Sequence, residues 1–401
     1  MKKIIVGIIV ILVLIFGVAE IQKNIKENNK KENNQTIAQE VKEEKVEEDK
    51  TIHMTVTGDV LCHNTNFFDA YDAQTDSYDF SYSFEDIEKY FVNSDIAIGT
   101  LETNFAGKSV GYSNYPLFNS PEALATDLKE LGFDILATAN NHCLDKGFSG
   151  LENTLAELDK VGIEHMGTYA TEEDSKEYLI KDVNGIKMAF LNYTYGTNGI
   201  SVPSGKEYAI NMIDKDKIKS DLENVKTENV DVICVNMHWG QEYRLTPTEE
   251  QEQLADFLFQ NGVDLILGSH THCLEPMEKR TVTLEDGTTK DGFVIYSLGN
   301  FMSGQNADNS RQSVILDIQL TKKGIDGSIS IDKVEYTPIY MYNYYTAKSA
   351  HRFKVMDIEA EIAKYESGDT SIGSSMYNTL KNELKEVYNV VGPEIGIEEF
   401  N

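Results

Sequence analysis

The sequence predicts an α/β domain with a largely parallel core, and three observations lead to that prediction. From residue 53 onward, short apolar runs alternate with amphipathic segments at helical spacing, which is typical of consecutive βα units. The run at 263–267 is apolar except at Asp264, as expected of a buried strand. Five of the apolar runs end in polar residues, which indicates a functional site at one edge of a sheet. With 401 residues, 41% of them hydrophobic, the chain is long enough for one large domain.

The first part of the domain is expected to alternate strands with helices. Strands are predicted at 53–60, 95–101 and 133–139, and helices at 84–92, 121–131 and 147–161. Pro121 lies near the start of the second helix, where its missing N–H leaves no hydrogen bond unmade. Leu151, Leu155 and Leu158 recur at helical spacing, so the third helix is expected to bury one face against the core.

The second part begins in the same way and then changes to hairpins. Strands are predicted at 187–195, 230–237 and 263–267, with helices between them at 214–225 and 248–260. Hairpin strands follow at 280–284 and 292–298, around an Asp286-Gly287 turn, and then at 313–320 and 327–338. These hairpins suggest a second sheet. The main domain is therefore expected at 51–345, with a helical C-terminal extension at 346–401 that ends in an acidic tail.

The N-terminal fifty residues differ in composition from the rest of the chain. Lys2 and Lys3 precede an apolar run at 4–19, which as a helix spans about 24 Å at ~1.5 Å per residue. We expect residues 1–19 to be a single-pass membrane anchor, with the domain outside the membrane because the lysines favour a cytoplasmic N-terminus. A cleaved signal peptide, which would make the protein secreted, is the alternative. Residues 20–50 carry seven lysines, nine acids and no aromatic residue, which predicts a disordered charged linker.

The net charge of −30 limits the classes of partner. Such a chain has no basic surplus to neutralise phosphates, so a nucleic-acid partner is not expected. The same charge disfavours adhesion to an anionic membrane surface away from the N-terminus. If the substrate is an anion, local cations such as bound metal must overcome this field.

Four cysteines leave their role open on sequence alone. Cys62, Cys143, Cys234 and Cys273 could pair in three ways in an oxidising compartment. No Cys-x-x-Cys spacing occurs, and a free cysteine packs as a small hydrophobic residue. We therefore favour small buried side chains at strand ends over a thiolate metal site.

Side chains that can coordinate a metal follow five of the predicted strands. In chain order they are Asp59 with His63 four residues later, Glu102, the run Asn140-Asn141-His142, His238, and the pair His270 and His272. Each one alone has an ordinary structural explanation, such as a turn acid, a helix cap or a core histidine. Because the carboxyl ends of parallel strands share one sheet edge, all five groups are expected to meet there. In an extended segment His270 and His272 would also project to the same side. Together they predict a metal site.

Six motifs in this order resemble the CapA-like capsule-synthesis proteins, also called the poly-γ-glutamate biosynthesis family. They are TGDVL at 57–61, TLE at 100–102, ANNHCLDKG at 139–147, HWGQEY at 238–243, GSHTHCLEPME at 268–278 and YSLGNF at 296–301. The resemblance covers residues 51–340 and extends to the calcineurin-like metallophosphoesterases. It implies a four-layer α/β/β/α sandwich around a site for two divalent metal ions, with Mn, Fe or Zn as the expected metals.

The resemblance also implies a role for each site residue. It places Asp59 and His272 on one metal, Asn141, His238 and His270 on the other, and Glu102 between the two. His142 would protonate a leaving oxygen, and His63 and Asn140 are possible additional site residues. Two adjacent cations can activate a water nucleophile, hold an anionic oxygen and neutralise developing charge.

The chain departs from the family pattern at three positions. Leu61 stands where metallophosphoesterases have a histidine two residues after the first aspartate, and His63 lies further along. Glu102 replaces the aspartate of the broader superfamily, and Thr100 stands where the capsule family has asparagine. With one ligand missing, the first metal site is expected to be weak or empty, which leaves open whether the protein is an enzyme.

Three functions follow from the resemblance as expectations. The first is an extracytoplasmic, membrane-anchored protein that makes or exports an anionic capsule polymer such as poly-γ-glutamate. The second is a metal-dependent phosphoesterase that hydrolyses cell-surface or nucleotide phosphates. The third is a non-catalytic scaffold for a membrane polymer synthase. The expected partners are accordingly the membrane through the N-terminal helix, a polymer-synthase complex, and an anionic polymer or phosphate substrate.

Overall fold

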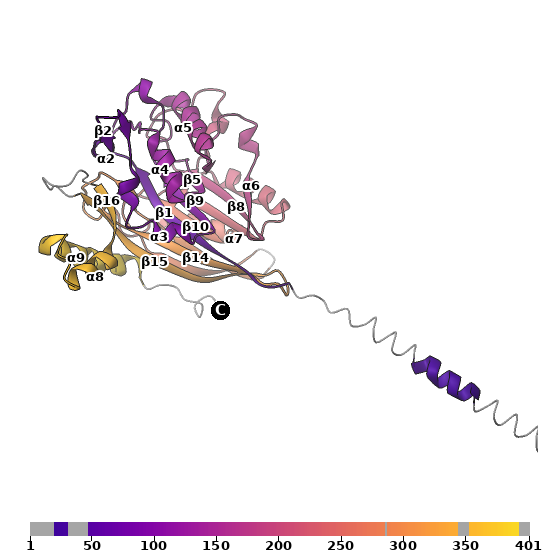
Figure 1. Ribbon diagram of the computed structural model, residues 1–401. Helices are drawn as coiled ribbons and strands as arrows, with labels where there is room; N and C mark the ends of the chain where they lie inside the picture. Colours follow the sequence, from indigo (N-terminus) through magenta and orange to yellow (C-terminus); the bar gives the residue numbers. More distant parts are fainter. Residues whose placement is uncertain (1–19, 31–46, 285–286, 344–352, 393–401) are drawn as a thin grey trace, which may run out of the picture. The chain divides into compact units, whose positions relative to one another are not determined.

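The computed structural model describes residues 20–30, 47–284, 287–343 and 353–392 (Figure 1). The expected membrane anchor or signal peptide at 1–19 lies outside these residues, as do 31–46 of the expected linker and the acidic tail. Residues 20–30, inside the expected linker, are helical with exposed side chains. Within the described ranges, no helix combines the length and apolar character needed to cross a membrane. The described residues from 49 onward form one compact unit, which contains all the elements below.

The first sheet combines a parallel half with an antiparallel half. Its strand order is β16-β15-β14-β1-β4-β5-β6, and β13 also pairs with β1. The parallel half consists of β1 (Lys50–Leu61), β4 (Ile96–Leu101), β5 (Ile135–Ala137) and β6 (Glu164–Met166). The antiparallel half consists of β14 (Gln312–Lys322), β15 (Ile329–Asn343) and β16 (Phe353–Asp357), while β13 (Asn300–Ser303) runs parallel to β1.

The second sheet has six strands in the order β11-β12-β10-β9-β8-β7. Its centre is parallel and consists of β8 (Ile186–Thr194), β9 (Val232–His238), β10 (Leu265–Ser269) and β12 (Thr289–Ile295). The antiparallel strands β7 (Leu179–Val183) and β11 (Met277–Thr283) close the two edges. A separate small hairpin joins β2 (Tyr71–Asp72) to β3 (Ser77–Tyr78).

The α/β class is confirmed and a second sheet is present, but the predicted hairpins are divided between the two sheets. The hairpin of β11 and β12 extends the second sheet, whereas β14 and β15 extend the first. Both sheets therefore mix parallel and antiparallel strands. Alternating apolar residues determine which face of a strand is buried, and they carry no information about which sheet the strand joins.

Buried side chains define four layers. Between the sheets, residues such as Ile98 of β4 and Phe190 of β8 belong to one continuous apolar cluster. The outer face of the first sheet packs against α4 (Ala123–Leu131) and α5 (Gly147–Val161). The outer face of the second sheet packs against α6 (Lys215–Thr227) and α7 (Glu249–Gln260). The order is helices, sheet, sheet, helices.

Three helical regions differ from the helices that the sequence predicts. The helix expected at 84–92 is only a 3₁₀ turn (Ser81–Phe84) and one turn of α3 (Lys89–Val92), neither of which has a side-chain cap at its start. A short helix α2 (Asn64–Asp69), which the sequence analysis does not include, follows β1. After residue 345 the chain adds β16 to the first sheet before it forms α8 (Ile358–Glu366) and α9 (Gly373–Val391), so the C-terminal extension is not purely helical.

Candidate metal centre

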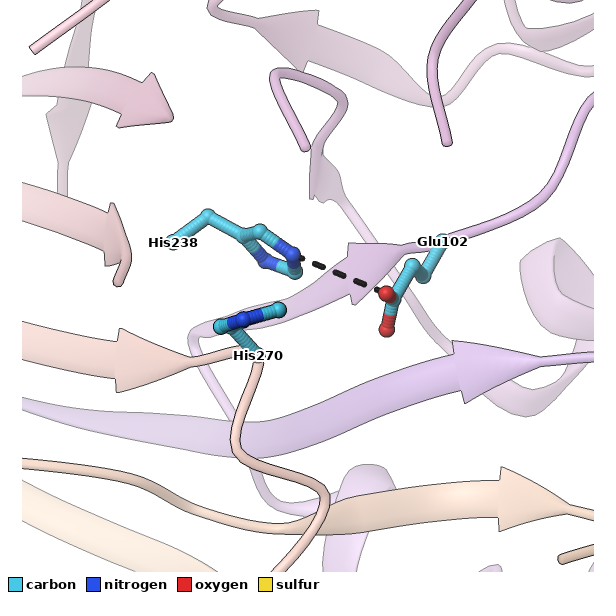
Figure 2. Close-up of side chains that lie close together, drawn as sticks. All are labelled: Glu102, His238 and His270. Atoms are coloured by element: carbon cyan, nitrogen blue, oxygen red, sulfur yellow. Dashed lines mark ion pairs between the residues drawn. The ribbon is translucent and has the colours of Figure 1, made fainter. Parts of the chain in front are cut away.

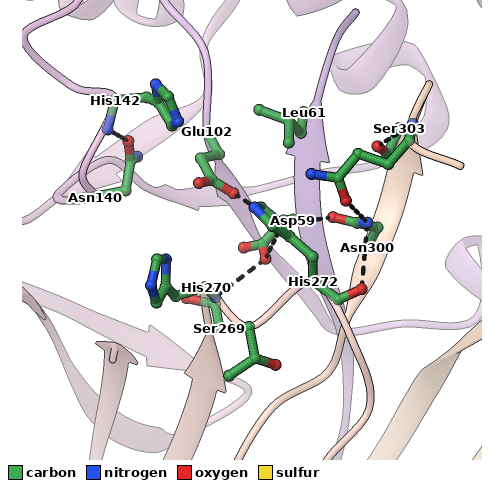
Figure 3. Close-up of polar contacts among 12 residues, drawn as sticks. Asp59, Leu61, Glu102, Asn140, His142, Ser269, His270, His272, Asn300 and Ser303 are labelled. Carbon is green, nitrogen blue, oxygen red and sulfur yellow. Dashed lines mark hydrogen bonds and ion pairs between the residues drawn. The ribbon is translucent and has the colours of Figure 1, made fainter. Parts of the chain in front are cut away.

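The ends of strands from both sheets meet at one place. Asp59 lies near the end of β1 and Glu102 directly follows β4, both in the first sheet. His238 is the last residue of β9, and His270 directly follows β10, both in the second sheet. All of these side chains are buried. The site thus lies where the carboxyl ends of two parallel strand sets converge (Figures 2 and 3).

The first group of donors consists of Glu102, His238 and His270, whose nearest ligand atoms all lie within 4.8 Å of one another. His238 Nε2 is 3.6 Å from Glu102 Oε1 (Figure 2) and 2.7 Å from Asn141 Oδ1. On the other side of the ring, His238 Nδ1 is 2.9 Å from Ser269 Oγ. These contacts hold the imidazole so that Nε2 faces the carboxylate and the amide oxygen.

The second group consists of Asp59, Glu102 and His272, again with ligand atoms within 4.8 Å of one another. His272 Nδ1 is 3.8 Å from Asp59 Oδ2 and 3.8 Å from Glu102 Oε2. The backbone N–H of His270 donates to Asp59 Oδ2 at 3.1 Å, which ties the two groups together. Glu102 is common to both groups.

The electrostatics of the two groups favour a bound cation. Burial raises the pKa of Glu102 to about 8, and burial together with the neighbouring Glu102 raises the pKa of Asp59 well above its usual range. Burial also lowers the pKa of His238, His270 and His272 well below the ordinary value, so these rings are neutral. Two buried carboxyls facing neutral imidazoles lack a positive partner.

Unpartnered polar atoms point to the same conclusion. Asp59 Oδ1, both carboxylate oxygens of Glu102 and His270 Nδ1 are buried without a hydrogen-bond partner. Such atoms are rare in folded proteins, because each one costs the desolvation free energy of the group. Carboxylate oxygens and neutral imidazole nitrogens are the ligands of divalent metals such as Mn, Fe and Zn. The donor set therefore fits divalent cations.

His142 lies beside the metal groups and is held by an acid that the sequence analysis does not include. His142 Nδ1 is 2.7 Å from Asp145 Oδ2, which also accepts the backbone N–H of Phe118 at 2.7 Å. Burial alone would lower the pKa of His142, but the hydrogen bond to Asp145 and the charge of Glu102 outweigh it, so the pKa is raised. The ring of Phe118 packs edge-on against His142, with centroids 4.8 Å apart. The spacing of Asp145 three residues after His142 is the signal in the sequence that could have indicated this pair.

The histidine loop after β10 is not extended, which corrects the expectation behind the pairing of His270 and His272. Their φ angles are 95° and 59°, in the left-handed region that residues with a Cβ seldom adopt. The two imidazoles consequently belong to different donor groups, with ring centroids 6.1 Å apart. Strained backbone of this kind clusters at functional sites.

His63 and Asn140 lie next to the donor groups without joining them. His63 Nδ1 is 2.9 Å from the carbonyl oxygen of Leu61 and 3.1 Å from the backbone nitrogen of Gly304, and burial lowers its pKa to about 4. Asn140 donates to the carbonyl oxygens of Leu101 and Thr138 and accepts the backbone N–H of His142. His63 thus fixes the end of β1, and Asn140 shapes the loop that presents Asn141 and His142.

Two tyrosines at the site were not anticipated from the sequence. Tyr195 packs against His270 with centroids 4.4 Å apart, and Tyr243 packs against His272 at 6.0 Å. Both rings remain partly open to solvent, with 45% and 44% of their surface exposed. They form apolar walls beside the metal groups. Isolated tyrosines in loops give no sequence signal of such a position.

Comparison with known proteins gives a family and several relatives. The family model described as "Bacterial capsule synthesis protein PGA_cap" matches residues 53–305. The PGA biosynthesis protein CapA of Bacillus subtilis (strain 168) is 31% identical over 273 residues, which is 64% of this chain and 64% of that protein. The capsule biosynthesis protein CapA of Bacillus anthracis is 27% identical over 292 residues, which is 69% of this chain and 66% of that protein. The chain thus spans slightly less than two thirds of each relative's own length.

A solved structure also overlaps with the fold. The calcineurin-like phosphoesterase YfkN from Bacillus subtilis aligns with a TM-score of 0.44 at 16% identity, over 85% of this chain and 97% of that chain.

Proposed function

Because the chain belongs to the family of bacterial capsule synthesis proteins called PGA_cap, we propose that it makes or exports an anionic capsule polymer of the poly-γ-glutamate type. The curated relatives with the same domain are named for PGA and capsule biosynthesis, which supports this role. We propose that the chemistry takes place at a two-metal, phosphoesterase-like site and that residues 1–19 anchor the domain outside the membrane.

One observation supports the two-metal site above all others. Glu102 lies between two histidine-containing groups, and both of its oxygens are buried without a partner. A carboxylate in this position has no stabilising role in a metal-free protein, since burial raises its free energy. Two cations, one in each group, would satisfy both oxygens at once.

The residues of the site would divide the chemistry between them. When bound, the metals supply positive charge that polarises a phosphoryl oxygen and activates water. Asn141 and Ser269 orient His238, and Asp145 orients His142. His142 holds a proton at the edge of the site and can give it to the leaving oxygen. Tyr195 shields one side of the site from bulk water.

Hydrolysis of cell-surface or nucleotide phosphates is the second candidate function, and the pair of His142 and Asp145 favours it over a non-catalytic scaffold. A scaffold that only binds polymer needs no oriented proton donor. The 2.7 Å contact between His142 Nδ1 and Asp145 Oδ2 fixes the ring, and its other nitrogen, Nε2, lies 3.4 Å from Asn198 Nδ2. Both catalytic candidates use the same site and differ in substrate.

The test uses the purified full chain. Metal content is measured by inductively coupled plasma mass spectrometry, and hydrolysis of phosphomonoesters and phosphodiesters is assayed with and without Mn²⁺. His238→Ala should lose metal and turnover, while His53→Ala, a change at a half-exposed histidine paired with Asp317, should keep both. Metal without turnover would rule out the phosphoesterase chemistry and leave the scaffold role.

The biological role and the location need separate measurements. Deletion of the gene should reduce surface polymer, and re-expression of the wild-type chain, but not of the His238→Ala variant, should restore it. Unchanged polymer in the deletion strain would contradict the capsule role. Fractionation should find the full-length chain in the membrane, and loss of residues 1–19 should release the domain.

A further inference from the structure

We propose that the amide oxygen of Asn300 completes the metal group of Asp59, Glu102 and His272, in place of the histidine that is absent at Leu61. This inference rests on the proposed two-metal site and concerns which side chains hold its first ion. It changes the expectation for that site from weak or empty to complete.

Leu61 itself cannot supply the missing ligand. Its side chain is apolar and 1% exposed, and it lies beside Asp59 and Glu102 in Figure 3. His63 does not replace it in this structure, because it is not among the donors that lie within 4.8 Å of one another in this group, and its Nδ1 contacts the backbone of Leu61 and Gly304. Among the described residues, the His, Asp, Glu and Cys side chains at this position are the three already named. The remaining donor must come from another residue type.

Strand pairing brings Asn300 next to Asp59. β13 runs parallel to β1, and Asn300 is the register partner of Asp59. β4 also runs parallel to β1, with Thr100 as the partner of Asp59, two residues before Glu102. Asp59 is therefore flanked by the strand that carries Asn300 and by the strand that leads to Glu102. Asn300 is fully buried.

The hydrogen bonds of Asn300 fix which end of its amide faces the site. Its Nδ2 donates to Gln305 Oε1 at 3.0 Å and to the carbonyl oxygen of Ser310 at 3.0 Å, and it lies 3.4 Å from the carbonyl oxygen of His272. These three acceptors occupy the nitrogen end of the amide. The oxygen end is left to face the site, with Oδ1 3.1 Å from His272 Nδ1 (Figure 3).

The distances suit donors that share one cation. His272 Nδ1 lies 3.1 Å from Asn300 Oδ1 and 3.8 Å from both Asp59 Oδ2 and Glu102 Oε2. Neighbouring donors on a cation with bonds of about 2.1 Å lie about 3 Å apart. A His272 nitrogen that binds a metal carries no proton, so Asn300 Oδ1 would then lose its hydrogen-bond donor. Coordination of the same cation gives that oxygen a partner again.

The completed group differs in character from the other one. It would contain three oxygens and one nitrogen. The group of Glu102, His238 and His270, with Asn141 as the fourth ligand that the family resemblance implies, would contain two of each. Oxygen-rich sets favour harder cations such as Mn²⁺ and Mg²⁺, and imidazole-rich sets favour Zn²⁺ and Fe²⁺. We therefore expect the Asn300 site to prefer Mn²⁺.

The test measures Mn²⁺ binding to the full chain, without reference to turnover. The wild type should bind two ions, and because they share Glu102 their electron paramagnetic resonance spectrum should show spin coupling. Asn300→Ala should bind one ion with an uncoupled six-line spectrum, and affinity for the second should fall about 100-fold or more. Mutation of a residue that only hydrogen-bonds to a metal ligand lowers metal affinity by ~10–100-fold. A loss of affinity smaller than about 100-fold in Asn300→Ala would therefore make Asn300 a positioning residue and overturn the proposal.

A control and a rescue separate ligand loss from damage to the strand. Met302→Ala truncates a side chain of the same strand that packs on the opposite face, so it should lower the melting temperature and still bind two coupled ions. Adding Leu61→His to Asn300→Ala should restore the second ion by returning a donor to the position two residues after Asp59. Loss of an ion in Met302→Ala, or no restoration in the double variant, would contradict the proposal.

The outcome also distinguishes this inference from the proposed function. If the wild type binds no Mn²⁺ or other divalent metal, the two-metal function fails and the inference fails with it. If the wild type binds two ions and Asn300→Ala binds them with unchanged affinity, only the role of Asn300 is wrong.

Discussion

Glu275 is a buried acid that belongs to neither metal group. Gln251 Nε2 donates to its Oε2 at 2.6 Å, while Oε1 is buried without a partner. Burial raises the pKa of Glu275 to about 7, although the hydrogen bond from Gln251 and the charge of Arg244 act in the opposite direction. Near neutral pH this carboxyl therefore takes up a proton more readily in the folded chain than in the unfolded one.

This pKa predicts how stability changes with pH. Since the folded value lies above the ordinary 4.5, the stability contributed by the protonated carboxyl is full below about pH 4.5 and is lost as pH rises toward 7. Glu275→Gln should remove that loss, so the variant should gain about 3 kcal/mol over the parent at pH 8 and little at pH 4.5. Urea unfolding of both proteins in EDTA measures the difference.

An exposed acid provides the control for this comparison. Glu130 lies on the solvent face of α4, and Glu130→Gln should give the same small effect at both pH values. A gain of equal size at pH 4.5 and pH 8 in Glu275→Gln would show that packing, and not ionisation, is responsible.

His142 is expected to act as a proton donor, and the choice of substrate can reveal it. His142→Ala should slow hydrolysis of alkyl phosphates, which have poor leaving groups, by about 10²–10⁴-fold. It should slow the hydrolysis of p-nitrophenyl phosphate much less, since the p-nitrophenolate leaving group needs no proton. The rate of alkyl phosphate hydrolysis by Asp145→Asn should lie between the rates of the parent and of His142→Ala. This variant keeps the imidazole ring of His142 but removes the negative charge beside its Nδ1. Equal losses for both substrates would mean that His142 binds and does not protonate.

At the scale of elements, the junction of β10 with the chain after β12 sets the position of the histidine loop. A Cβ at Gly268 would lie 1.8 Å from the carbonyl oxygen of Tyr296, so only glycine fits there without moving the backbone. Gly268→Ala should therefore destabilise the protein by about 2 kcal/mol and weaken Mn²⁺ binding, since His270 follows two residues later.

Gly196→Ala is the matched control for that change. A Cβ at Gly196 would meet no other atom within 4 Å, and the φ of this glycine is not in the left-handed region. The substitution should leave metal binding intact and change stability by no more than about 1 kcal/mol. Differential scanning calorimetry and Mn²⁺ titration of both variants give the answer. Normal metal binding in Gly268→Ala would show that the loop tolerates a shift of its base.

The elements that the sequence predicts best are those with a long periodic pattern. The helix at 147–161 is placed at its observed bounds because three leucines mark one face, and the strand ends at Glu102, His238 and His270 follow from apolar runs that stop at polar residues. The four-residue strand β13 and the three-residue β6 are too short for a period to be visible. Asn300 is missed for this reason, since its importance comes from pairing with β1.

Tertiary constraints account for the remaining differences. The φ angles of His270 and His272 are positive, a conformation that residues with a Cβ seldom adopt and that the sequence pattern does not indicate. The position of His63 was also undetermined, because the short helix α2 turns the chain directly after it. The sequence thus predicts which side chains approach the site. Only the structure shows how these side chains divide into two donor groups.

For the whole molecule, metal binding should be a large part of its stability. A ligand that binds only the folded state adds about 2.7 kcal/mol per site at a concentration of 100 Kd, so excess Mn²⁺ should raise the melting temperature by roughly 5 °C over the protein in EDTA. The net charge of −30 should increase this stabilisation by Mn²⁺, since it attracts cations and destabilises the compact metal-free state. Differential scanning fluorimetry with and without Mn²⁺ measures the shift.

Glu102→Gln separates two effects of the carboxylate that both donor groups share: its effect on stability without metal and its effect on metal binding. The metal-free variant should melt at or above the metal-free parent, because a neutral amide replaces an acid that burial disfavours. The Mn²⁺-induced shift should be lost, since Glu102 serves both donor groups. A metal-free variant that melts lower and still gains from Mn²⁺ would contradict the assignment of Glu102.

If two ions occupy the site as proposed, their sharing of Glu102 means that they would not bind independently. The first ion to bind would orient the carboxylate of Glu102 and neutralise its buried negative charge. The second oxygen would then be in position for another cation but would attract it less strongly. These two effects have opposite signs, and their difference is a coupling free energy that each ion exerts equally on the other. A cell that alters its manganese supply would thereby change the populations of empty, half-loaded and fully loaded protein in a graded or a switch-like manner, according to the sign of that coupling.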